Sequence, residues 1–242
     1  MRVVGHRGWP AKYPENSLPG FAAAVALGVD AIELDVHLTR DDHVVVFHDE
    51  DTKRVADRDV SVRQSTLAEL KTLDVGAKYS PRFAGTRIPT LGEVIEALGA
   101  RTSFFVEVKD PRETAARLNA RLVPMIDALA GRVVVQSFSA DYLRTFRVLR
   151  PDVPTGFLCA ASGETIATTL ELGCAAIHPS WDSLTPALNR AIRKAGLGLY
   201  VWNVRTPDDC RKVLETLDVD AVGCDCPDVM LERLKRRPRW KK

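Results

Sequence analysis

The chain has 242 residues, of which 45% are hydrophobic and 27% are charged, a composition typical of a soluble globular protein with a sizeable core. Aromatic residues make up only 7%, so we expect a mainly aliphatic core. No segment is apolar enough to span a membrane, and the first residues lack the apolar region of a signal peptide. We therefore expect a cytoplasmic protein without a stable membrane anchor.

The net charge of +2 is unevenly distributed. Residues 235–242 form a basic C-terminal tail that carries six of the 34 basic residues and no acid. The rest of the chain holds 28 basic and 32 acidic residues, so its net charge is −4. We interpret the tail as a solvated terminus, with contact to a membrane surface or nucleic acid as the alternative, and we expect no nucleic-acid partner.

The first elements follow a β-loop-α-β order. A short apolar strand at Arg2–Gly5 precedes a helical stretch at Leu18–Leu27, which ends at Gly28, and a second strand follows at Ala31–His37. This order is typical of a parallel α/β fold.

The second strand carries two acids on one face. Glu33 and Asp35 stand two residues apart, and a strand projects such side chains in the same direction. The chain then turns and returns at Val44–Phe47, ending at His48. Because this connection is too short for a parallel crossover, we predict a β-hairpin. The hairpin would place an imidazole close to two carboxylates.

The segment at about residues 50–87 is polar and weakly periodic, and we interpret it as a small insertion after the second strand. Regular alternation resumes beyond it. Further strands are predicted at Ser103–Val108, Val133–Gln136, Thr155–Leu158, Ala175–His178, Leu199–Asn203 and Ala221–Gly223, with helices near Arg112–Leu129, Ala140–Leu149, Gly163–Leu172, Thr185–Lys194, Pro207–Thr216 and Val229–Lys235. Eight parallel strands predict a single TIM-barrel domain over residues 1–242. The alternative is an open doubly wound sheet, which more often carries a G-x-G-x-x-G turn that is absent here.

Active sites of TIM barrels lie at the carboxyl ends of the strands. The polar residues predicted there are His6, Arg7, Glu33, Asp35, Glu107, Lys109, Gln136, His178 and Trp202. Glu33, Asp35 and Glu107 would lie within a few ångströms of one another. A divalent cation that prefers oxygen ligands, Mg²⁺ or Ca²⁺, would offset their repulsion. A structural network of ion pairs between these acids and the two cationic side chains is the alternative.

The remaining polar residues suggest an anionic substrate and proton transfer. Arg7 and Lys109 suit a phosphate, since arginine offers a planar fork and lysine a point charge. His6 and His48 are the acid–base candidates, because only imidazole titrates near neutral pH without perturbation. In the predicted substrate pocket, His178 either lines the wall or caps its strand, and Trp202 either packs on the carbon skeleton of an alcohol group or belongs to the core.

Several motifs together resemble the glycerophosphodiester phosphodiesterase family. They run along most of the chain and comprise H-R-G at residues 6–8, P-E-N-S at 14–17, G-V-D-A-I-E-L-D-V-H-L-T-R-D at 28–41, V-V-F-H-D at 45–49, I-P-T-L-G-E-V at 88–94, E-V-K at 107–109, Q-S-F at 136–138, V-W-N-V at 201–204 and G-C-D-C-P at 223–227. The departures from the family pattern are mild, the clearest being Cys224 where the family often has threonine.

The resemblance implies a TIM barrel with one divalent cation on Glu33, Asp35 and Glu107. It also implies His6 and His48 as the acid–base pair and Arg7 and Lys109 on the phosphate. Asn16 is similar to the family's asparagine beside the site, where it would position Arg7 or the phosphate. The reaction implied is hydrolysis of a small-molecule glycerophosphodiester to sn-glycerol 3-phosphate and an alcohol, in lipid and glycerol metabolism. The short insertion is like that of bacterial soluble members and suggests a broad choice of head group.

Other readings stay open at this point. A lysophospholipase D-type phosphodiesterase on the same barrel would act on lipid substrates, and a non-catalytic metal-binding barrel would keep the site without turnover. The sequence does not choose between Mg²⁺ and Ca²⁺, between the two histidines as base and acid, or between direct attack by water and a cyclic phosphate intermediate. It also does not predict the oligomeric state.

Overall fold

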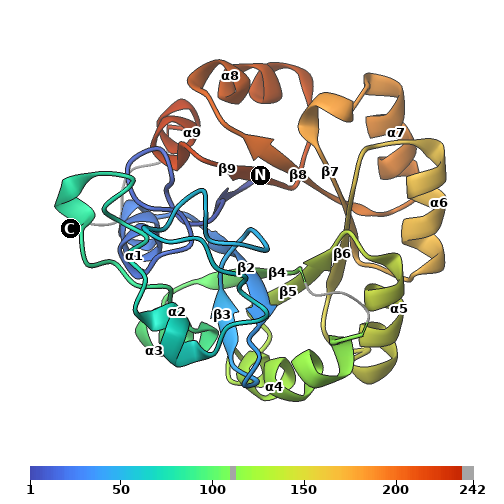
Figure 1. Ribbon diagram of the computed structural model, residues 1–242. Helices are drawn as coiled ribbons and strands as arrows, with labels where there is room; N and C mark the ends of the chain where they lie inside the picture. The colour runs from blue at the N-terminus through green and yellow to red at the C-terminus, as the bar shows by residue number, and fades with distance from the viewer. Residues whose placement is uncertain (110–112, 236–242) are drawn as a thin grey trace.

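A computed structural model describes residues 1–109 and 113–235, and it has the predicted barrel. The eight parallel strands are β1 (Arg2–Gly5), β2 (Ala31–Leu38), β4 (Ser103–Val108), β5 (Val133–Ser137), β6 (Thr155–Cys159), β7 (Ala176–Pro179), β8 (Gly198–Val204) and β9 (Ala221–Cys224). The barrel closes because β1 pairs with both β9 and β2. Figure 1 shows this ring of strands surrounded by helices. The TIM-barrel prediction is confirmed.

The helices that form the outer layer follow the strands in order. They are α1 (Leu18–Leu27), α3 (Leu91–Leu98), α4 (Ala115–Asp127), α5 (Ala140–Leu149), α6 (Gly163–Glu171), α7 (Pro186–Lys194), α8 (Pro207–Thr216) and α9 (Pro227–Arg233), with short 3-10 turns η1 (Pro81–Phe83) and η2 (Trp181–Ser183). Arg112, the predicted start of the helix that corresponds to α4, lies outside the described residues. Many of these helices begin with a side chain that caps the N-terminus, such as Thr90, which forms a capping box with Glu93.

Side chains of β2 point alternately toward the helices and toward the barrel axis. Ile32, Leu34 and Val36 are fully buried in the main apolar cluster between strands and helices. Glu33 and Asp35 alternate with them and point to the other side. A strand with apolar residues at every second position therefore delivers its acids to the barrel interior.

The predicted hairpin is also present. β3 (Val44–Val46) runs antiparallel to β2, with Val36 opposite Val46 and Leu38 opposite Val44. The backbone N–H of Phe47 donates to the carbonyl of Asp35 at 3.0 Å. This bond extends the pairing by one residue and fixes where the following residue, His48, enters the site.

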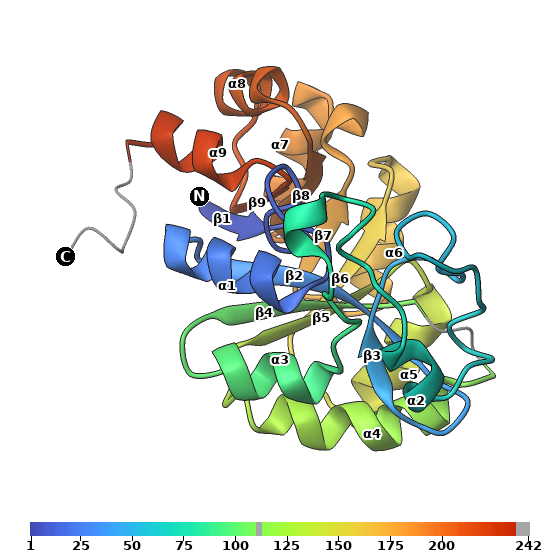
Figure 2. The ribbon, with the colours of Figure 1, turned by 60° about the vertical axis from the view of Figure 1, so that its left-hand side comes forward.

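The inserted segment between β3 and α3 contains the one-turn helix α2 (Leu67–Lys71) and lies beside β3 (Figure 2). It builds a small apolar cluster that the sequence analysis did not anticipate. The cluster consists of Val45, Phe47, Ala56, Val62, Leu70, Leu73, Val75 and Ile88. Because two of its members belong to the hairpin, the segment packs directly on the element that carries His48.

Within the described part of the chain, no helix combines the length and the apolar character needed to cross a membrane. Of the basic tail predicted at 235–242, all but the first residue lie outside the described residues.

Candidate active site

Three buried carboxylates from β2 and β4 converge at one end of the barrel. The two strands pair in parallel with Asp35 opposite Glu107, which brings these acids side by side, and Glu33 lies two residues earlier on β2. One oxygen from each carboxylate lies within 4.8 Å of the others. Atoms Oδ1 of Asp35 and Oε1 of Glu107 are buried and face the ammonium group of Lys109. Oxygen atoms in this arrangement can hold a divalent cation.

Two cationic side chains partly neutralise the carboxylate cluster. Nζ of Lys109 lies 2.5 Å from Oε1 of Glu107 and 3.2 Å from Oδ1 of Asp35. Nε of Arg7 lies 3.4 Å from Oδ2 of Asp35, and the backbone N–H of Arg7 donates to Glu33 at 3.0 Å. The ion-pair network that the sequence left as an alternative is therefore present, but two cations face three acids.

Burial and the neighbouring charges shift the pKa values of all three acids. Burial, together with the charges of its acidic neighbours, raises the pKa of Glu33 well above its usual range. Burial and Asp35 raise the pKa of Glu107 to about 7. Burial would also raise the pKa of Asp35, but Lys109 and Arg7 outweigh it, so that its pKa lies below the usual range. The site therefore disfavours full ionisation of all three acids unless another cation is added.

His6 directly follows β1, and its ring is held by Asp225, which directly follows β9. Its Nδ1 donates to Oδ1 of Asp225 at 2.7 Å, and its Nε2 lies 4.0 Å from Oε2 of Glu33. The carboxylate of Asp225 can only accept, so the proton of a neutral His6 ring resides on Nδ1. Nε2 is then the atom that can exchange a proton beside the carboxylates.

His48 follows the hairpin and is held in the same manner. Its Nδ1 donates to Oδ1 of Asp49 at 2.5 Å, and Nε2 of His37 donates to its backbone carbonyl at 3.1 Å. Burial lowers the pKa of the His48 ring, with Arg7 adding to the effect and Asp35 opposing it. A neutral imidazole at this position is suited to accept a proton.

These side chains line a cavity of about 230 Å³ at the carboxyl ends of the strands. Its wall includes His6, Arg7, Glu33, His48, Glu107 and Lys109, together with Gln136, Phe138, His178, Trp202 and Arg205. The cavity extends into the barrel as far as Phe105 and Tyr200. An anionic group and a short carbon chain can thus share one cavity.

Three of the predicted pocket residues form one connected wall. Gln136 donates to Oε1 of Glu33 at 3.4 Å and accepts from Nδ1 of His178 at 2.7 Å. The indole N–H of Trp202 donates to the carbonyl of His178 at 2.7 Å. Burial lowers the pKa of His178 to about 3, so this ring is neutral. The wall connects a carboxylate of the cluster to the aromatic residues of the pocket.

Asn16 takes a different place from the other predicted residues. It does not line the cavity; its Nδ2 donates to Oδ2 of Asp35 at 2.7 Å, and its Oδ1 accepts from the backbone N–H of Asp35 at 3.4 Å. Its backbone N–H donates to the carbonyl of Arg7 at 3.0 Å. Asn16 therefore fixes the orientation of one carboxylate from behind.

Sequence reasoning assigned no role to several acids that hold the site. Asp49 and Asp225 bind the two histidines, and Glu15 accepts from Nη1 of Arg7 at 3.0 Å. Two of these acids are direct neighbours of predicted site residues in the sequence: Asp49 follows His48, and Glu15 precedes Asn16. No local sequence pattern connects Asp225 with His6, because only closure of the barrel brings their strands together.

A model of the glycerophosphoryl diester phosphodiesterase family matches residues 6–229. The chain belongs to this family. The match covers every residue of the candidate site, and the resemblance stated from the motifs is confirmed. The chain is thus an enzyme of the phosphoric diester hydrolase class.

Relatives with the same overall length support this assignment. A glycerophosphodiester phosphodiesterase of Caldanaerobacter subterraneus subsp. tengcongensis is 32% identical over 97% of this chain and 98% of its own. A structure of a phosphodiesterase from Oleispira antarctica in complex with the product sn-glycerol-3-phosphate has a TM-score of 0.89 and is 26% identical, covering 97% of both chains. A glycerophosphodiester phosphodiesterase structure from Thermotoga maritima is 30% identical with a TM-score of 0.76, covering 98% of both.

Proposed function

We propose that this enzyme hydrolyses glycerophosphodiesters to sn-glycerol 3-phosphate and an alcohol in a metal-dependent reaction with two histidines as acid and base. The observation that carries the proposal is the cluster of three buried carboxylates, two of which, Glu33 and Glu107, line the same cavity as His6 and His48. Membership of the family and the product bound by the Oleispira antarctica relative support the choice of substrate.

Glu33, Asp35 and Glu107 would hold the metal ion. Two observations support the fit: one oxygen from each of the three buried carboxylates lies within 4.8 Å of the others, and burial together with the neighbouring acids raises the pKa values of Glu33 and Glu107. Oxygen donors of this kind suit Mg²⁺ or Ca²⁺. When bound, such an ion supplies charge neutralisation at the phosphoryl oxygens and lowers the pKa of an oxygen nucleophile.

Both histidines present the same ring atom to the substrate. Nδ1 of each ring donates to a carboxylate, Asp225 for His6 and Asp49 for His48. Nε2 of each ring is therefore the atom left to transfer a proton. One Nε2 would take a proton from the nucleophile, and the other would give one to the leaving alkoxide. The fixed orientation of both rings reduces the cost of aligning them.

Arg7 and Lys109 would bind the phosphate. Both line the cavity, and acids raise the pKa of each despite burial, so both stay charged. Both contact Asp35 and belong to the cavity wall, so they place positive charge where the substrate anion would bind.

The proposal is tested by release of glycerol 3-phosphate from glycerophosphocholine and glycerophosphoethanolamine, with EDTA and after restoring Mg²⁺ or Ca²⁺. We expect metal-dependent release from both substrates. His6→Ala and His48→Ala should each abolish turnover and leave metal binding intact. Wild-type activity in either variant contradicts the acid–base assignment. Release from lysolipid vesicles alone would instead favour the lysophospholipase D alternative.

A further inference from the structure

The side chain of Arg54 joins the inserted segment to two acids of the site. Its Nη1 and Nη2 each donate to one oxygen of Glu15 at 2.7 Å, which is a bidentate pair. Its Nε donates to Oδ2 of Asp49, also at 2.7 Å. All three nitrogens of the guanidinium therefore donate to two carboxylates from different loops.

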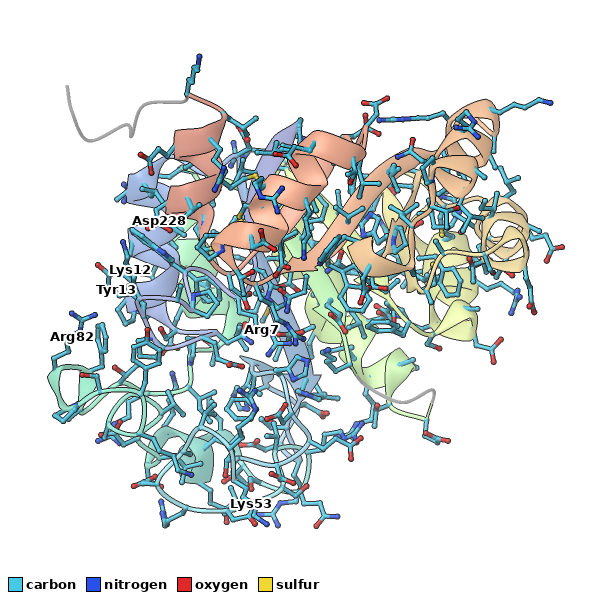
Figure 3. The ribbon with its side chains drawn as sticks, turned by 90° about the horizontal axis from the view of Figure 1, so that it is seen from above. Arg7, Lys12, Tyr13, Lys53, Arg82 and Asp228 are labelled. Carbon is cyan, nitrogen blue, oxygen red and sulfur yellow. The ribbon has the colours of Figure 1, made fainter. Side chains whose placement is uncertain are left out.

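Each of these acids in turn holds a residue of the proposed machinery. The second contact of Glu15 is with Nη1 of Arg7 at 3.0 Å, and the other oxygen of Asp49 accepts from Nδ1 of His48 at 2.5 Å. Figure 3 shows Arg7 between the barrel and the inserted segment, and Lys53, the neighbour of Arg54 in sequence, on that segment. Arg54 thus stands behind both Arg7 and His48 without lining the cavity they share.

The geometry distinguishes this network from an ordinary surface ion pair. Isolated exposed pairs contribute little, but bidentate arginine–carboxylate geometry in a network is the exception. Glu15 and Asp49 are largely covered, with 19% and 25% of their side chains exposed, and Arg54 keeps 47%. The pKa of each acid is lowered despite burial, with the hydrogen bond from Arg54 as the largest lowering cause.

We propose that Arg54 is a positioning residue that fixes Arg7 through Glu15 and His48 through Asp49. This inference rests on the proposed roles of Arg7 and His48. Through one guanidinium, the inserted segment sets the position of the phosphate-binding arginine relative to that of the acid–base histidine. Small displacements of such groups cost large factors in rate.

The first test is Arg54→Gln, measured as kcat and KM for glycerophosphocholine hydrolysis with saturating metal. We expect a loss of about 10- to 100-fold in kcat/KM, shared between a lower kcat and a higher KM because both His48 and Arg7 are displaced. Arg54→Lys keeps the charge but loses the fork, so its loss should be smaller. Arg58→Gln is the matched control, since Arg58 contacts Thr72 within the same segment. Activity of Arg54→Gln within about twofold of wild type overturns the inference.

A second test separates positioning from general loosening of the fold. In a Glu15→Gln/Asp49→Asn background, Arg54 has no acid left through which to act, so adding Arg54→Gln should change kcat/KM by less than about twofold. A further tenfold loss in that background overturns the inference. Affinity of the Arg54→Gln variant for Mg²⁺ or Ca²⁺ alone, measured by calorimetry, should match wild type, because Arg54 does not contact the carboxylate cluster; a large loss would point to disruption instead.

Controls keep this test separate from the proposed function. If Arg54→Gln does not yield folded protein, as judged by circular dichroism and thermal unfolding, Arg54→Lys is used in its place in both tests. His48→Ala is assayed beside them. An active His48→Ala variant contradicts the proposed function, whereas an inactive His48→Ala together with a fully active Arg54→Gln contradicts this inference alone.

Discussion

Asp225 accepts a hydrogen bond of 2.7 Å from Nδ1 of His6, although 219 residues separate the two in sequence. β1 and β9 pair in parallel with Gly5 opposite Cys224, so barrel closure itself sets His6 beside Asp225. The acid holds the imidazole in one tautomer and one orientation. The relationship between the first and last strands is thus part of the candidate site.

Replacing Asp225 by asparagine should therefore lower turnover without removing the barrel contact. The amide of Asp225→Asn is neutral and no longer stabilises a protonated His6, so we expect kcat to fall by about 10- to 1000-fold, with little change in metal affinity. Steady-state kinetics and calorimetry measure the two quantities. Asp228→Asn, which alters an acid paired with Lys12 nearby, is the control. Equal activities for the two variants would argue against the role of Asp225.

Removal of one carboxylate of the cluster should greatly weaken metal binding. Asp35→Asn takes away the acid that contacts both Lys109 and Arg7, and we expect Mg²⁺ and Ca²⁺ affinity to drop by at least about 100-fold. Calorimetry on metal-free protein measures this, and thermal unfolding shows whether the variant is folded. Glu96→Gln, an exposed position on α3, is the matched loss of one negative charge. Unchanged affinity in Asp35→Asn would contradict the proposed metal site.

The metal-free enzyme should lose stability as the pH rises. Because the pKa of Glu107 is raised to about 7, the folded state keeps its proton above the usual carboxylate pKa, where the unfolded state has released it. We expect the free energy of unfolding to fall by roughly 1–3 kcal/mol between about pH 5 and pH 8. Saturating Mg²⁺ or Ca²⁺ should remove most of this slope, and Glu107→Gln should reduce it. Urea unfolding checks this; a slope that neither metal nor substitution alters would refute the assignment.

The close approach of Gly156 to His178 gives a test of the pocket wall. A methyl group at residue 156 would lie 2.2 Å from ring atoms of His178, which Gln136 holds in place. Gly156→Ala should therefore destabilise the protein by about 1–3 kcal/mol and raise KM, since the wall must shift. Gly163→Ala, with open space around the added atom, is the control. Adding His178→Ala should recover part of the lost stability; no difference between the two glycine variants would count against the predicted contact.

Much of the fold was predictable because the relevant signals are local. The predicted bounds of the helix at Ala140–Leu149 agree with the structure, and the strand predicted at Ala31–His37 ends one residue later. The i, i+2 spacing of Glu33 and Asp35 correctly placed both acids on one face of β2. The apolar cluster of the inserted segment was not predicted, since its members lie at irregular spacings between residues 45 and 88.

The sequence alone determined the barrel, the hairpin and the set of polar side chains at the carboxyl ends of the strands. Periodicity decides which face a side chain takes, and that choice depends only on near neighbours in the chain. Only the tertiary structure decided the partners of those side chains: Asp225 for His6, Arg54 for Glu15 and Asn16 for Asp35. These pairs join segments that come together when the barrel closes and the insertion packs on β3. Their distances depend on strand register and core packing, which no local pattern encodes.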